Sequence, residues 1–152
     1  MIESTGNIWN GLEDPQVDAI CVTTNGVLKR NGALVMGAGI ALQARQMFPG
    51  IDAIAGPLVE LRGNVVHPLW TANGTRIVSF PTKNNWLDQS SISLILRSAG
   101  QLVELADNNH WGRVLLTRPG CGNGGLSWVV VRKVIEPLLD DRFVVVTPPR
   151  LR

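Results

Sequence analysis

The amino-acid sequence predicts an α/β protein, a three-layer α/β/α sandwich with a mixed central sheet. Short apolar segments rich in β-branched residues, typical of buried strands, alternate with segments of helical periodicity. An Asn-Gly pair between two of the strands favours a tight hairpin, so one strand pair is expected to be antiparallel. With 152 residues, 45% of them hydrophobic and 17% charged, the chain is expected to form a single domain over residues 1–152 with a large core.

The predicted strands share short runs of apolar, mostly β-branched residues. They are residues 2–4, 18–23, 64–69, 75–80, 113–117 and 142–147. Asn73 and Gly74 lie between the third and fourth of these segments, and both residues can adopt the positive φ that a two-residue hairpin turn requires. Helical segments separate most of the other strands, which favours a sheet that is covered on both faces.

The predicted helices share apolar residues at three- and four-residue intervals. They are residues 40–48, 51–61, 91–106 and 127–139. Pro49-Gly50 ends the first helix, and Gly56-Pro57 interrupts the second. Ser127 is a favourable N-cap residue, and Pro137 is expected to end or kink the last helix.

Composition and charge exclude several function classes. The formal net charge is +2 without a dense basic stripe, so charge neither indicates nor excludes a nucleic-acid partner. No apolar run approaches the roughly 18 residues of a membrane span, and the first residues lack the pattern of a signal peptide. Two cysteines, Cys21 and Cys121, are too few for a disulfide framework or a zinc site. We therefore expect a cytoplasmic protein, monomeric by default, with no metal, no cofactor and no membrane partner.

Glycine gathers in two loops, each between a predicted strand and a predicted helix. The first is NGALVMGAGIA, residues 31–41, and the second is RPGCGNGGLSW, residues 118–128. Such loops expose backbone N–H groups beside a helix N-terminus, and together these attract phosphate. Ligands of open α/β sheets sit beyond the carboxyl ends of the strands, where both loops are expected. Either loop alone could be an ordinary turn, but the pair favours a diphosphate. Neither matches a Walker loop or a Rossmann fingerprint.

Four segments carry a resemblance to a known family. The runs DAICVTTNG, VMGAGIALQA, FPTK with Trp86 nearby, and GCGNGGLSW resemble, in this order, the macrodomain family of ADP-ribose-binding modules. The similarity extends over residues 6–147. It is nearest to the branch that contains the terminal ADP-ribose glycohydrolases and the antitoxin that removes ADP-ribose from DNA bases. The resemblance implies a macrodomain fold and a hydrolase that removes ADP-ribose from modified nucleic acid or protein.

The resemblance also implies a set of ligand-binding residues. The first loop, Met36, Gly37, Ala38, Gly39 and Ile40, would wrap the diphosphate and the distal ribose. The second loop, Gly120, Cys121, Gly122, Asn123, Gly124, Gly125 and Leu126, would close over the same diphosphate. Asn25 would lie near the distal ribose. Asn7, followed by Ile8, replaces the family's aspartate that accepts a hydrogen bond from the adenine amino group. An amide oxygen can still accept this bond, although without the assistance of a charge.

Lys83 is the candidate catalytic residue. From its own sequence context it could be an ordinary surface charge, but in the enzymes that the chain resembles this lysine acts at the anomeric carbon of the distal ribose. A deprotonated lysine can attack a masked carbonyl carbon and form a Schiff base. Some glycohydrolases of the branch pair the lysine with an acidic residue where this chain has Gly124. The antitoxin-like members also have glycine there.

Four other residues near these motifs have simpler interpretations. Cys121 is expected to be a small packing residue, although the helix after it could lower the pKa of its thiol. Trp86 and Trp128 are expected to pack against the protein rather than stack on a ligand. Asp88 is expected to cap the helix that follows it.

Two alternative functions remain open from the sequence. The domain could be a non-catalytic module that binds ADP-ribose or a related nucleotide signal, which the glycine at position 124 supports. It could instead be a phosphatase that cleaves ADP-ribose 1″-phosphate on the same fold.

Overall fold

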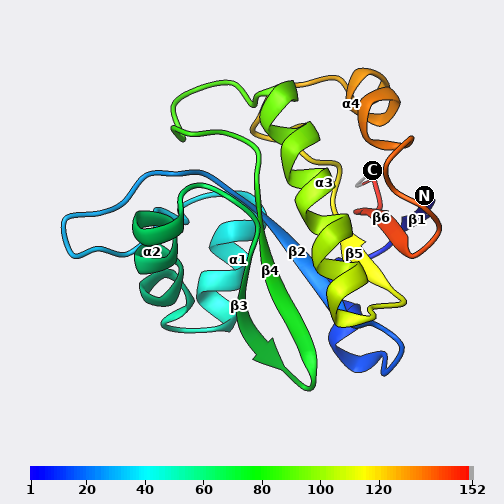
Figure 1. The fold of residues 1–152 in the computed structure, drawn as a ribbon, viewed down its shortest axis with the longest axis horizontal. Coiled ribbons are helices and arrows are strands. Elements are labelled where there is room, and N and C mark those ends of the chain that lie inside the picture. The colour runs from blue at the N-terminus through cyan, green and yellow to red at the C-terminus, as the bar shows by residue number, and fades with distance from the viewer. Residues whose placement is uncertain (151–152) are drawn as a thin grey trace.

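A computed structural model describes residues 1–150, and residues 151 and 152 lie outside the described part of the chain. At its centre is a six-stranded sheet with the order β1-β6-β5-β2-β4-β3 (Figure 1). The strands are β1 (Ile2–Thr5), β2 (Ala19–Thr24), β3 (His67–Ala72), β4 (Thr75–Pro81), β5 (Val114–Leu116) and β6 (Phe143–Thr147). All neighbouring pairs are parallel except β3 with β4. The predicted mixed sheet is therefore confirmed.

The hairpin between β3 and β4 differs from its prediction in one respect. Asn73 (φ 52°) and Gly74 (φ 81°) form the two-residue turn, as predicted. The strand β3, however, begins at His67 and extends to Ala72, three residues later than the predicted segment 64–69. Thr71 and Ala72 belong to β3 because they pair with β4. The residue types at positions 71 and 72 do not reveal this pairing.

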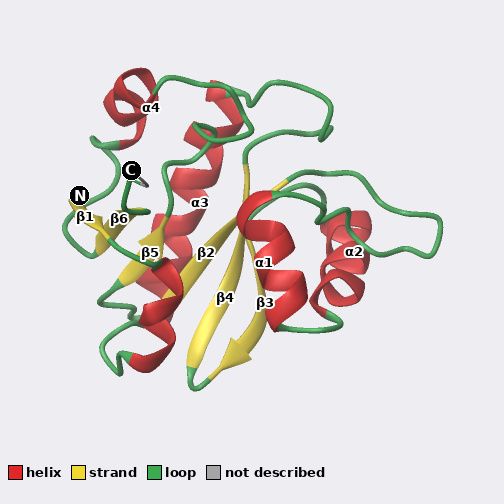
Figure 2. Ribbon diagram, turned by 180° about the vertical axis from the view of Figure 1, so that it is seen from behind, coloured by secondary structure: helices red, strands yellow, loops and turns green. Residues whose placement is uncertain are grey.

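Helices cover both faces of the sheet (Figure 2). They are the 3-10 helix η1 (Ile8–Glu13) and the α-helices α1 (Gly39–Met47), α2 (Ile51–Arg62), α3 (Ile92–Asn109) and α4 (Trp128–Ile135). Along β2, Ile20 and Val22 pack with α1 and α2 in one core cluster, whereas Ala19 and Cys21 pack with α3 and α4 in the other. This alternation places one apolar layer on each side of the sheet, as the three-layer prediction requires.

Three helix predictions need correction. Helix α2 continues through Gly56-Pro57 without a break. Glycine at position 56 lets the helix pack against the turn at Gly32, since a Cβ at Gly56 would overlap the carbonyl oxygen of Gly32. Helix α4 ends at Ile135 instead of residue 139, shortly before Pro137, which has no N–H to continue the helix. Ser91, and not Asp88, caps α3, since Ser91 Oγ accepts a 3.3 Å hydrogen bond from the Leu94 N–H.

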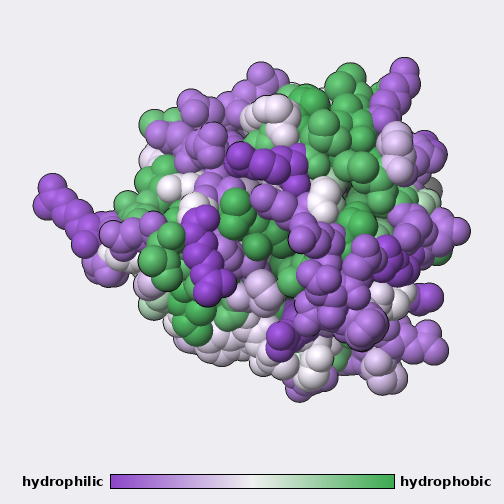
Figure 3. Space-filling view, viewed as in Figure 1, coloured by the Kyte–Doolittle hydropathy of each residue, from purple (hydrophilic) through white to green (hydrophobic). Residues whose placement is uncertain are grey.

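Hydrophobic side chains also reach the surface. Figure 3 shows a group of them over α4 and the adjoining part of α3, where Leu96, Val129 and Val130 are exposed. Within residues 1–150, no helix combines the length and the apolar character that crossing a membrane requires.

Candidate functional site: a cleft between two glycine loops

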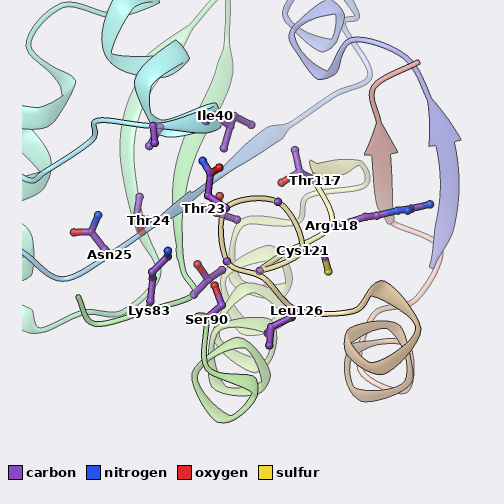
Figure 4. Close-up of a pocket in the computed structure, with 18 of the residues that line it drawn as sticks. Thr23, Thr24, Asn25, Ile40, Lys83, Ser90, Thr117, Arg118, Cys121 and Leu126 are labelled. Carbon is purple, nitrogen blue, oxygen red and sulfur yellow. The ribbon is translucent and has the colours of Figure 1, made fainter. Parts of the chain in front are cut away.

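A cleft of about 1010 Å³ lies where β2, β4, β5 and β6 end. Parallel strands direct their carboxyl ends to the same edge of a sheet, and the loops that follow them meet there. The walls come from some of the residues in the segments 23–25, 35–41, 82–90, 117–128 and 146–148. Figure 4 shows Lys83, Thr24 and Asn25 on one side of the cleft and Cys121 and Leu126 on the other. The two glycine loops are therefore brought together, as the sequence predicts.

Two helices begin at this cleft without a side-chain cap. Ala38 is the N-cap residue of α1 and has no hydrogen-bonding side chain, and Ser127 precedes α4 without making a capping hydrogen bond. Ala38, Gly39 and Ile40 line the cleft at one helix, and Leu126 and Trp128 line it at the other. The first N–H groups of a helix have no intrahelical acceptor and carry the positive end of its dipole. The cleft therefore offers anion-binding groups from two sides.

The charged side chains in the cleft are all cationic. Lys83 and Arg118 line it, and no Asp or Glu is among its lining residues in the part of the chain that the structure describes. Arg118 also lies over the ring of Trp128, with its guanidinium carbon 5.2 Å from the ring centroid. Two cations without a facing carboxylate favour an anionic ligand.

Lys83 is held by its backbone. The Thr82 N–H donates a 3.0 Å hydrogen bond to the Thr24 carbonyl oxygen, and Asn64 Nδ2 donates one of 3.0 Å to the carbonyl oxygen of Lys83 itself. The Lys83 side chain turns back to its own loop, where Nζ donates to the carbonyl oxygens of Asp88 (3.1 Å) and Trp86 (3.4 Å). Lys83 Nζ thus makes two hydrogen bonds to its own loop, and one further bonding direction of Nζ is left for a ligand.

Asn25 closes the first loop rather than projecting freely. Its Nδ2 donates a 3.0 Å hydrogen bond to the Val35 carbonyl oxygen, and its Oδ1 accepts one of 2.9 Å from the Val27 N–H. The loop between β2 and α1 also rests on α2, because the Leu34 N–H donates to the Asp52 carbonyl oxygen over 3.0 Å. Asn25 therefore fixes the shape of the loop and lines the cleft at the same time.

The second loop is tied to the segment before α3. The Ser90 N–H donates a 3.0 Å hydrogen bond to the Gly124 carbonyl oxygen, and Gln89 Nε2 donates one of 3.3 Å to that of Gly125. Gly120 has a φ of +76°, a conformation that glycine adopts without strain, and its carbonyl oxygen accepts from the Leu126 N–H. These hydrogen bonds therefore fix the second loop as one wall of the cleft.

Cys121 lines the cleft with a partly buried thiol. Burial raises the pKa of this thiol above its ordinary value, and the nearby Arg118 guanidinium opposes that rise only in part. The net shift is upward rather than downward, because desolvation of the thiolate outweighs the charge of Arg118. Cys121 Sγ donates a weak hydrogen bond to the Pro119 carbonyl oxygen at 3.5 Å.

Most of the predicted site residues lie in the cleft. The lining includes Asn25, Gly37, Ala38, Gly39, Ile40, Lys83, Gly120, Cys121, Gly122, Asn123, Gly124 and Leu126, and does not include Asn7, Ile8, Met36 or Gly125. Ile8 and Met36 are buried in the core, and Asn7 Oδ1 accepts a hydrogen bond from the Trp9 N–H. Gly6 donates to the carbonyl oxygen of Thr147, a lining residue, so Asn7 lies one residue from that wall.

Several lining residues were not predicted from the sequence. They are Thr23, Thr24, Val35, Ala41, Thr82, Ser90, Thr117, Arg118, Val146, Thr147 and Pro148, together with Trp86 and Trp128, which were expected to pack. Their shared signal is position, since many stand at the carboxyl end of a parallel strand. Trp128 does pack against the core, as predicted, and also lines the cleft. Within residues 1–150, no cluster of three His, Cys, Asp or Glu residues could hold a metal ion.

Comparison with known proteins places this geometry in a family. No protein-family model matches the chain. The DNA ADP-ribosyl glycohydrolase of Thermus aquaticus is 31% identical over 143 residues, which cover 86% of this chain and 36% of that protein. The chain spans about a third of the length of the curated relatives it matches.

Solved structures agree with this relationship. The macrodomain of Thermus aquaticus DarG has a TM-score of 0.76 and 28% identity, with 97% of both chains covered. A Thermosipho africanus DarTG structure in complex with ADP-ribose has a TM-score of 0.76 over all of this chain and 43% of that one; at 21% identity it supports the fold alone. The chain belongs to the macrodomain family. Within that family it is a macrodomain of the DarG branch.

Proposed function

We propose that this macrodomain binds ADP-ribose in the cleft and removes it from modified DNA by cleaving the bond between the distal ribose and a base. The observation that carries the proposal is Lys83, whose Nζ lies in a cleft that has two cations and two uncapped helix N-termini. The choice of DNA rests on the relatives named DNA ADP-ribosyl glycohydrolase, of which this chain matches one part.

The proposal assigns one orientation to ADP-ribose in the cleft. The diphosphate lies between the N-terminus of α1 and the loop of residues 120–126, whose backbone N–H groups can donate to its oxygens. The distal ribose then lies toward Asn25 and Lys83, at the ends of β2 and β4. The adenine lies toward the wall at Thr147. Asn7 follows Gly6, which is hydrogen-bonded to Thr147, so the Asn7 side chain is the proposed acceptor of a hydrogen bond from the adenine amino group.

Lys83 can act on the distal ribose in two ways. As an amine it attacks the anomeric carbon: the carbon–nitrogen bond to Lys83 forms, the bond to the base breaks, and the departing base nitrogen takes up the proton that the newly bonded Lys83 nitrogen loses. Water then releases ADP-ribose and restores the amine. As an ammonium, Lys83 instead gives its proton to the departing base nitrogen while water attacks the same carbon. Neither route needs a carboxylate, and none lines the cleft within residues 1–150.

The experiment that tests the proposal combines binding with product release. Titration calorimetry with a chelator present compares ADP-ribose with AMP, and we expect tighter binding of ADP-ribose because the cleft can engage two phosphates. In parallel, the protein is incubated with ADP-ribosylated DNA and ADP-ribosylated protein. Release of free ADP-ribose from the DNA supports the proposal. Equal affinity for AMP and ADP-ribose would contradict the orientation, and binding without release would contradict the glycohydrolase activity.

A further inference from the structure

We propose that Trp86 is the surface on which the ADP-ribosylated base stacks, so that it selects nucleic acid over protein as the substrate. The inference rests on the proposed function, because it requires that Lys83 acts where the ribose meets the base. The inference adds a residue that contacts the base, whereas Lys83 acts on the ribose at the other end of the cleaved bond.

Trp86 is unusual among the large apolar side chains of this protein. It is 52% exposed, yet it lines the cleft. The other tryptophans are more buried, and three of them have aromatic or cationic partners: Trp9 and Trp70 pack against Phe48, and Trp128 lies under Arg118. Trp86 has no such partner within residues 1–150. An indole left in solvent at a ligand cleft is a surface available for stacking.

The loop between β4 and α3 fixes Trp86 relative to Lys83. This loop projects beyond the sheet in Figure 1. Asn85 forms a turn around Trp86, since its Oδ1 accepts from the Leu87 N–H at 3.0 Å and its carbonyl oxygen accepts from the Asp88 N–H at 3.0 Å. Lys83 Nζ then bonds to the Trp86 carbonyl oxygen at 3.4 Å. The backbone of Trp86 and the reacting nitrogen therefore belong to one hydrogen-bonded turn, and both residues line the cleft.

The chemistry of the leaving group connects this turn to a base. Whichever way Lys83 acts, its Nζ must come close to the anomeric carbon, and the base is attached directly to that carbon. The base must therefore lie within a few ångströms of Nζ, in the cleft that Trp86 also lines. Every nucleobase has a π-face that can stack on an indole, whereas an acidic or hydroxyl side chain of a modified protein has none.

The test compares two neighbouring exposed residues. Trp86→Ala removes the proposed surface, Trp86→Phe keeps an aromatic face, and Leu87→Ala is the matched control, because Leu87 is 72% exposed and does not line the cleft. Single-turnover release of ADP-ribose is measured on an ADP-ribosylated single-stranded oligonucleotide and on an ADP-ribosylated protein. Calorimetry with free ADP-ribose is run on every variant.

We expect Trp86→Ala to lower kcat/KM on the oligonucleotide by about 5- to 150-fold, the range that loss of one base–aromatic stack produces. Trp86→Phe should restore most of the rate, Leu87→Ala should keep it within about twofold, and affinity for free ADP-ribose should change less than about threefold in all variants. Unchanged release by Trp86→Ala, an equal loss on the modified protein, or an equal loss of ADP-ribose affinity would each overturn the inference.

Failure of the proposed function would look different. In that case the wild type would release no ADP-ribose from either substrate, or would not bind free ADP-ribose. The role of Trp86 is then measured by binding alone: wild type should bind the ADP-ribosylated oligonucleotide more tightly than Trp86→Ala does, with Leu87→Ala equal to wild type. Equal affinities of all three proteins would overturn the inference in this arm as well.

Discussion

The hydroxyl of Ser90 occupies the space that a side chain on Gly124 would need. A Cβ at position 124 would overlap Ser90 Oγ and would lie 2.5 Å from the Gly120 carbonyl oxygen. Ser90 Oγ itself is buried and has no hydrogen-bond partner within residues 1–150. Position 124 is therefore closed to the acidic residue that some glycohydrolases of this branch carry there. This agrees with a cleft whose charged lining residues within residues 1–150, Lys83 and Arg118, are both cations.

The first prediction concerns this packing. Gly124→Asp should lower the free energy of unfolding by about 1–3 kcal/mol or more, because the new side chain forces Ser90 or the loop of residues 120–125 to move. Thermal unfolding followed by circular dichroism measures the change.

Ser90→Ala is the control for this prediction. It removes a hydroxyl that is buried without a partner, so the melting temperature should stay the same or rise. A Gly124→Asp variant that unfolds at the wild-type temperature would show that position 124 is open after all.

The second prediction compares two helical glycines. Gly56→Ala should destabilise the protein, because the added Cβ overlaps the Gly32 carbonyl oxygen and separates α2 from the loop between β2 and α1. Gly100→Ala in α3 meets nothing within 4 Å and should stabilise the helix by about 0.5–1 kcal/mol. Chemical denaturation of both variants gives the two signs. If Gly56→Ala and Gly100→Ala changed the free energy of unfolding in the same direction, the prediction would be refuted.

The third prediction concerns the open side of the second loop. A Cβ at Gly122 meets no atom within 4 Å, so Gly122→Glu should keep the fold and the melting temperature. The carboxylate enters a cleft that is proposed to hold a diphosphate, and ADP-ribose affinity should fall at least about 100-fold through steric overlap and charge repulsion. Gly122→Ala, which adds volume without charge, should lose less. Normal ADP-ribose binding by a folded Gly122→Glu protein would show that this loop does not hold the phosphates.

The fourth prediction concerns the pH dependence of Cys121 alkylation. The thiolate is the reactive form, and burial raises the pKa of the thiol, so the thiolate fraction at pH 7 is smaller than in free cysteine. Iodoacetamide should therefore modify Cys121 more slowly than free cysteine at pH 7, and the rate should rise as the pH is raised from 7 toward 9. Mass spectrometry locates the modified residue, with Cys121→Ser as the control. A Cys121 that reacts faster than free cysteine at pH 7 would mean that the charges, not burial, control its pKa.

Much of the fold could be predicted because its signals are local. The apolar run of β2, the Asn73-Gly74 turn and the periodicity of α3 each depend on a few neighbouring residues, and all three are present in the structure. Two of the errors arose where distant contacts decide. Helix α2 contains Gly56 because the turn at Gly32 packs against it, and β3 extends through Thr71 because β4 pairs with it.

The part of the site that belongs to sequence motifs could be predicted. Lys83 and the two glycine loops could be recognised from their sequence, and they face one cleft. Ser90 and Thr147 belong to no motif; they line the cleft because strands and loops far apart in the chain meet there. The exposure of Trp86 could not be predicted either, since a tryptophan near a motif packs more often than it projects.

The most direct test of the account is single-turnover release of ADP-ribose from ADP-ribosylated DNA by wild type, Lys83→Ala and Lys83→Arg. We predict that wild type releases ADP-ribose and that Lys83→Ala is slower by at least about 100-fold, while its affinity for free ADP-ribose changes less than about threefold. Lys83→Arg separates the two routes, because a guanidinium stays protonated and cannot attack carbon. Release by Lys83→Ala at the wild-type rate would contradict the central claim that Lys83 acts on the bond between the ribose and the base.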